Sequence, residues 1–179
     1  MNHQASLPET RFKQPINGSW SLDRQRSRVE FQTRTLWGLM RVCGHFEDYE
    51  GRLDLAANPA IELTINSASL QSGNRKRDEH LRSADFFDSA HHPRVRFVSD
   101  SVAPEGPEGD TLRVRGRLFA RDRSVPLEMT AHVRRADGEL VLVTAVTAAH
   151  RELGMNWNWL GAISARTELR VSARLIPDS

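Results

Sequence analysis

The sequence predicts an all-β domain of antiparallel strands, arranged as a sandwich or as a barrel. Apolar and polar residues alternate with a period of two along most of the 179 residues, which is typical of strands with one buried face and one solvent face. Turn segments containing Gly, Pro, Asn or Asp separate these runs at 47–51, 56–60, 103–110 and 135–139. One stretch, residues 73–99, interrupts the alternation and predicts a short helix.

The elements follow in order from the N-terminus. Residues 1–18 are polar and contain two prolines, so we expect a flexible tail, and residues 19–177 suit one domain with a single core. Alternating runs predict strands at 28–34, 40–47, 53–55, 61–65, 94–97, 112–118, 127–133, 140–146 and 169–175. In 140–146 the inward face is ambiguous, because apolar residues occupy both parities.

The parity of these runs predicts which side chains point inward. The inward set is Val29, Phe31, Val42, Phe46, Leu63, Ile65, Phe97, Leu118 and Met129. Its members are apolar, and the charged inward residues that a sugar or nucleotide site would need are absent from the runs. A ligand held inside such a fold should therefore be a hydrocarbon chain.

The stretch 73–99 contains the one expected helix. Asn74 is a favourable N-cap residue, and Pro93 limits how far a helix can run. Phe86 and Phe87 follow the polar helical turn. A short helix that leaves one strand and returns to the next cannot lie in the sheet, so we expect it to cap an end or an edge.

The charge distribution does not favour nucleic acid. Lysine and arginine total 25 and aspartate and glutamate total 23, a formal net charge of +2, with a pI of about 9.2. The compact basic run 75–77 is followed at once by Asp78 and Glu79, and Asp78 with Arg82 has the i,i+4 spacing of a helical ion pair. This mixture predicts a solvated helix surface.

Cysteine usage and hydropathy predict a cytoplasmic protein. Cys43 is the single cysteine, so no intramolecular disulfide can form. The N-terminal residues lack a signal-peptide pattern, and no stretch approaches the roughly 18 apolar residues of a membrane span.

The sequence predicts no catalytic residue, no metal and no cofactor. His91 and His92 are adjacent, so their side chains seldom point the same way, and no Cys-x-x-Cys or His-x-x-x-His spacing accompanies them. A nucleophile-elbow motif is also missing.

The aromatic residues are more informative. Met155, Trp157 and Trp159 are spaced by two, so on a strand they would project to one side. They either pack in the core or line a cavity beside Phe86 and Phe87 as an aromatic collar.

Several spaced motifs resemble the YceI-like family. The similarity runs from about Trp20 to Ile176, and its most specific part lies between Ser69 and Phe97, where Ser-Leu, Arg-Asp-x-His-Leu, Asp-Phe-Phe-Asp and Pro-x-x-x-Phe follow in order. Further matching pieces are "WSLDRQRSRVEF", "GLMRVCGHFEDYEGRLDL", "VRGRLFARDRSVPLEM" and "LRVSARLI". The resemblance implies an extended antiparallel lipocalin-like β-barrel of about eight strands that holds a polyisoprenoid chain, and it is compatible with a homodimer.

These observations predict non-enzymatic binding, storage or transport of a long-chain isoprenoid lipid. The expected chain contacts are Phe31, Val42, Phe46, Leu63, Ile65, Phe86, Phe87, Phe97, Leu118, Met129, Met155, Trp157 and Trp159. The expected contacts of a phosphate or quinone oxygen at the mouth are Arg75, Arg77, His80 and Arg82. The alternatives are an enzyme acting on the head group, with His80 or His91 as general base, and a filled-core β-domain that binds a partner.

Overall fold

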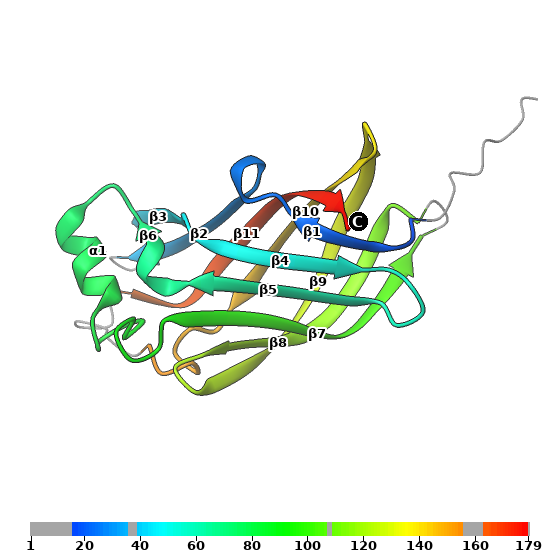
Figure 1. Ribbon diagram of the computed structural model, residues 1–179. Coiled ribbons are helices and arrows are strands. Elements are labelled where there is room, and N and C mark those ends of the chain that lie inside the picture. Colours follow the sequence, from blue (N-terminus) through cyan, green and yellow to red (C-terminus); the bar gives the residue numbers. More distant parts are fainter. Residues whose placement is uncertain (1–15, 36–38, 107–108, 156–162, 179) are drawn as a thin grey trace, which may run out of the picture.

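The alternating runs form the strands of a closed antiparallel barrel (Figure 1). The computed structural model describes residues 16–35, 39–106, 109–155 and 163–178. The strands are β1 (Ser19–Leu22), β2 (Arg28–Thr35), β3 (Met40–Phe46), β4 (Tyr49–Asp54), β5 (Ala60–Asn66), β6 (Leu70–Gln71), β7 (Arg94–Glu105), β8 (Thr111–Ala120), β9 (Arg123–Ala136), β10 (Glu139–Ala148) and β11 (Ile163–Pro177). The helix α1 spans Arg75–Arg82.

The eleven segments in the described part of the chain amount to eight long strands, because three of the long strands are interrupted. The 3-10 helix η1 (Arg24–Arg26) separates β1 from β2, residues 47–48 separate β3 from β4, and η2 (Ser67–Ser69) separates β5 from β6. β11 pairs with β10 along one edge, and with both β1 and β2 along the other. The order β1-β4-β5-β7-β8-β9-β10-β11 therefore returns to β1 and closes the barrel.

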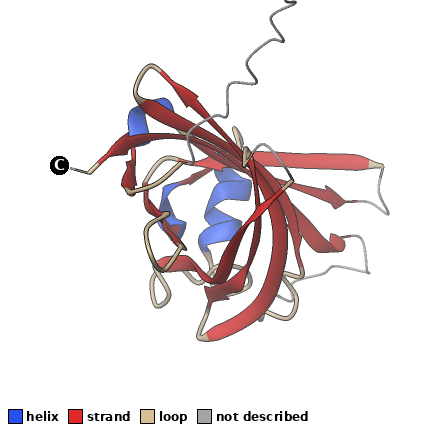
Figure 2. Ribbon diagram, turned by 90° about the vertical axis from the view of Figure 1, so that its right-hand side faces the viewer, coloured by secondary structure: helices blue, strands red, loops and turns tan. Residues whose placement is uncertain are grey.

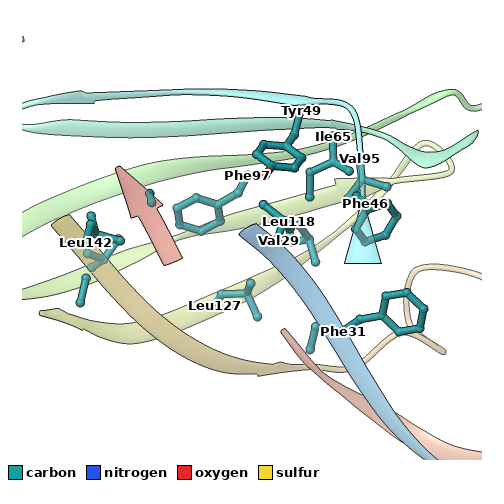
Figure 3. Packing of buried hydrophobic residues seen from close by; sticks show 14 of the residues in the cluster. Val29, Phe31, Phe46, Tyr49, Ile65, Val95, Phe97, Leu118, Leu127 and Leu142 are labelled. Atoms are coloured by element: carbon teal, nitrogen blue, oxygen red, sulfur yellow. The ribbon is translucent and has the colours of Figure 1, made fainter. Parts of the chain in front are cut away.

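The inward side chains form one hydrophobic core (Figure 3). The predicted inward orientation is confirmed for all nine residues: six are buried, and Val42, Leu63 and Met129 are half-buried and pack against the core. The ambiguity in β10 is resolved as well. Leu140 and Leu142 are buried, whereas Val143 is 47% exposed on the outer face.

Two glycines leave room for phenylalanine rings beside the barrel wall. A Cβ atom at Gly44 would lie 2.4 Å from the ring of its cross-strand partner Phe31. A Cβ atom at Gly116 would lie 2.7 Å from the ring of Phe97 and 2.3 Å from the carbonyl oxygen of Val98. Both sites exclude any larger residue unless the backbone shifts, and so the absence of a side chain positions each ring.

The helix α1 covers one end of the barrel, as expected for a cap (Figure 2). Asn74 is its N-cap, and its Oδ1 accepts a hydrogen bond from the Arg77 amide at 3.1 Å. The expected Asp78–Arg82 ion pair is wrong. Asp78 is 5% exposed and accepts hydrogen bonds from the Ser72 amide and hydroxyl, while Arg82 donates to a main-chain carbonyl of β6. These hydrogen bonds fasten the helix to β6 and to the residue that follows it.

Candidate functional site

The described side chains line two mainly apolar cavities inside the barrel, neither of them fully closed. The first has a volume of about 100 Å³ and is lined by residues such as Leu63, Phe97 and Met129. The second has a volume of about 70 Å³ and lies at the capped end, since Leu81 of α1 and Phe86 of the following segment contribute to its wall. The interior is thus partly empty at two places.

Three aliphatic residues stand between the cavities. Ile65 of β5, Leu118 of β8 and Leu169 of β11 line both of them. Ile65 and Leu118 are buried, and Leu169 is half-buried against the core. We call these three residues the constriction, because a chain that filled both cavities would have to pass between them.

A row of phenylalanine rings borders the second cavity. The ring centroids of Phe31 and Phe46 lie 5.7 Å apart, those of Phe46 and Phe87 lie 5.9 Å apart, and those of Phe87 and Phe86 lie 5.6 Å apart. These separations and the tilted or edge-to-face angles are favourable for aromatic pairs. The row joins β2 and β3 to the segment after α1, so the cap and the barrel share one apolar surface.

Hydrogen bonds hold the segment between α1 and β7, residues 83–93, in place; we call it the cap segment. The Ser67 hydroxyl donates to the Ser89 hydroxyl at 2.9 Å in a buried contact. Arg121, in the turn between β8 and β9, donates from Nη1 to the carbonyl oxygen of Phe86 at 2.8 Å and to that of Gly154 at 2.7 Å. One guanidinium therefore ties the cap segment and the loop after β10 to the barrel end.

Three residues that carry polar groups line one side of the second cavity, although polar atoms make up little of its surface. Thr33 and Thr167 are cross-strand partners on β2 and β11, and His150 follows the adjacent strand β10. The Nδ1 of His150 lies 2.9 Å from the Thr167 hydroxyl oxygen, and its ring is 5.5 Å from that of Phe86. Burial, and to a lesser degree the charge of Arg151, lowers the pKa of His150 from 6.5 to about 4. The imidazole is neutral at pH 7.

The structure brings the predicted chain-contact residues together. Every described member of the set lines a cavity: Leu63, Phe97 and Met129 the first, Ile65 and Leu118 both, and Phe31, Val42, Phe46, Phe86, Phe87 and Met155 the second. Trp157 and Trp159 lie outside the described residues, so the aromatic collar stays a prediction for them. Contact with a ligand also stays a prediction.

The predicted head-group residues lie on α1 but do not line either cavity. Arg75 pairs with Glu79 at 3.0 Å, and Arg77 donates to the hydroxyl and carbonyl of Ser72 at 2.7 and 2.6 Å. Arg82 donates to the main chain of β6. The Nε2 of His80 lies 3.8 Å from a carboxylate oxygen of Asp85, in the segment after α1. The α1 side chain on the wall of the second cavity is Leu81.

Sequence reasoning missed the polar residues of the second cavity. Thr33 shares the inward face of its run with Val29 and Phe31, which is a weak indication that its side chain points into the barrel. His150 lies beyond the last alternating position of β10, and its partner Thr167 is 17 residues away. Arg121 gave no local signal, because its acceptors are on two other segments.

The described part of the chain contains no group of three or more His, Cys, Asp or Glu side chains arranged to hold a metal ion. His91 bonds to Asp88 at 2.9 Å, and His92 lies 3.4 Å from Asp122. The described helix is not long and apolar enough to cross a membrane.

Comparison with known sequences identifies relatives. A family model described as YceI-like domain matches residues 20–175. A UPF0312 protein of Shewanella denitrificans is 36% identical over 108 residues, which are 58% of this chain and 55% of the relative. Protein YceI of Escherichia coli O17:K52:H18 is 34% identical over 111 residues, 60% of this chain and 56% of the relative. The match thus spans a little over half the length of these curated relatives.

Solved structures share the fold. BcnA of Burkholderia cenocepacia superposes with a TM-score of 0.78 at 17% identity, covering 86% of this chain and 98% of that one. A polyisoprenoid binding domain from Saccharophagus degradans has a TM-score of 0.72 at 13% identity, covering 89% and 98%. The YCEI protein of Campylobacter jejuni has a TM-score of 0.65 at 20% identity, covering 79% and 88%. At these identities the likeness concerns the fold alone.

Proposed function

Because this chain belongs to the YceI-like family, we propose that it binds a long-chain isoprenoid lipid in the barrel interior. The observation that carries the proposal is the pair of apolar cavities on either side of the constriction. The Saccharophagus degradans structure, described as a polyisoprenoid binding domain, adds support through its fold.

Burial of the hydrocarbon supplies the binding free energy in this proposal. At about 0.8 kcal/mol per buried methylene, each five-carbon unit contributes roughly 3–4 kcal/mol before costs. The lost freedom of the chain offsets much of that gain. Each cavity is smaller than an engineered apolar cavity of roughly 150 Å³ that binds benzene. A long chain therefore enters only if the side chains of the constriction move apart.

The protein acts in this proposal by holding the lipid, in storage or transport, without converting it. The apolar walls supply contact area for a hydrocarbon. The cytoplasmic location and the homodimer stay predictions.

Organic extraction of the purified protein followed by mass spectrometry tests the proposal. We expect an isoprenoid lipid at up to one molecule per chain. A matched pair of variants on β10 sharpens the test: Val146→Phe places a ring in the first cavity, whereas Val143→Phe places it on the outer face. We expect the first variant to lose lipid and the second to keep it. The proposal would be refuted if the folded protein contained no isoprenoid after purification and bound none when isoprenoid was added.

A further inference from the structure

The second cavity has an asymmetric wall. Thr33, His150 and Thr167 come from three neighbouring strands or their ends, in the sheet order β10-β11-β2. The rest of the described lining is aliphatic, aromatic or thioether, apart from main-chain atoms. Burying polar side chains costs free energy unless they find hydrogen-bond partners. Here the side chains of His150 and Thr167 bond to each other, and the Thr33 hydroxyl donates to the carbonyl oxygen of Arg166 at 3.4 Å.

The polar groups of these three residues suit an oxygen without charge. A neutral imidazole has one donor and one acceptor, and each threonine hydroxyl can both donate and accept. The bond between His150 and Thr167 therefore uses only part of the capacity of the pair. No arginine or lysine is among the described residues that line this cavity. A phosphate or carboxylate placed there would lack a counter-ion, and an unpaired buried charge is very costly.

We propose that His150 and Thr167, with Thr33 beside them, bind an uncharged oxygen of the lipid, either an alcohol or a carbonyl. This inference rests on the proposed function and adds an orientation to it. The oxygen-bearing end lies under the cap, against the ring row that ends at Phe86. The hydrocarbon then extends through the constriction into the first cavity. The arginines of α1 take no part in holding the head group.

Three probes with the same carbon skeleton test the inference: geranylgeraniol, geranylgeranyl monophosphate, and the parent hydrocarbon that lacks the hydroxyl. Their affinities for the full chain are measured by competition with a fluorescent polyene. In the wild-type protein we expect the alcohol to bind more tightly than the monophosphate. In His150→Phe we expect the affinity of the alcohol relative to the hydrocarbon to fall about tenfold, because the buried hydroxyl loses its partner.

Two further variants keep the result interpretable. Met155→Leu changes the same cavity without touching a hydrogen bond, so the ratio of alcohol to hydrocarbon affinity should stay at the wild-type value. Thr167→Val removes the other half of the pair and should lower the ratio in the same direction, which covers the case that His150→Phe fails to fold.

The outcomes separate the inference from the proposed function. If the hydrocarbon binds and the ratio is unchanged in both His150→Phe and Thr167→Val, the polar anchor is wrong while lipid binding stands. A monophosphate that binds more tightly than the alcohol overturns the anchor as well. If none of the three probes binds to the wild-type protein, the proposed function fails, and the anchor fails with it.

Discussion

His150 makes the stability of the folded barrel depend on pH. Its side chain is 4% exposed, and burial lowers its pKa from 6.5 to about 4. The folded protein therefore resists protonation of this ring, whereas the unfolded chain takes up a proton near pH 6.5. Stability from this group is fully present above pH 6.5 and is lost as the pH falls toward 4, by roughly 3 kcal/mol in total.

We expect His150→Phe to flatten this acid dependence. The variant loses the contact with Thr167 at pH 7, but the phenylalanine side chain cannot take up a proton. Its free energy of unfolding should therefore fall less between pH 7 and pH 4 than that of the wild-type protein. Urea unfolding at a series of pH values measures the difference. His45→Phe, at an exposed site on β3, controls for the loss of one histidine. Parallel pH curves for His150→Phe and the wild-type protein would contradict this account.

The turn between β8 and β9 connects the cap segment to the barrel. Arg121 and Asp122 both have positive φ angles, 51° and 56°, which turn the chain sharply at the capped end. Arg121 donates to main-chain carbonyls on two segments, and Asp122 lies 3.4 Å from the Nδ1 of His92. The cap is therefore held by contacts from a turn that is distant in sequence.

We expect Arg121→Met to loosen the cap. Methionine keeps much of the apolar stem but leaves two carbonyl groups without their donor, at a cost of about 1–3 kcal/mol. Amide hydrogen exchange should become faster in residues 83–93, and bound lipid should dissociate faster. Arg115→Met is the matched control, because that guanidinium pairs with Glu128 on the outer face. Equal exchange rates at 83–93 in both variants would rule out this role.

The constriction decides whether the interior of the barrel is one space or two. Leu118 is 5% exposed and borders both cavities, whereas the neighbouring core residue Leu127 borders only the first. Leucine-to-alanine changes at buried sites typically cost 2–5 kcal/mol. The two positions thus allow a comparison at a similar cost in stability.

We expect Leu118→Ala to join the cavities and Leu127→Ala only to enlarge the first. The affinity for a longer isoprenoid alcohol relative to a shorter one should therefore rise in Leu118→Ala and stay near the wild-type value in Leu127→Ala. Thermal unfolding verifies that both variants fold and compares their losses of stability. A rise of equal size in both variants would mean that the constriction does not limit the chain.

Local patterning was sufficient to predict much of the candidate site. Period-two parity placed Phe31, Leu118 and Met129 inside, because successive side chains of a strand point to opposite faces whatever their partners. The helix start at Asn74 was predictable for a similar reason, since an N-cap interacts with residues only three positions away.

Closure, the cavities and the contact between His150 and Thr167 depended on the tertiary structure. The pairing of β11 with both β1 and β2 joins residues about 140 positions apart, and alternation in one strand carries no information about its neighbour. The roles of His150 and Arg121 were hidden for the same reason, because their partners lie on other segments. The order of residues along each strand settles which of its faces is apolar. Only the closed barrel decided where those faces leave space and which polar side chains border it, since empty volume arises from the packing of many distant residues.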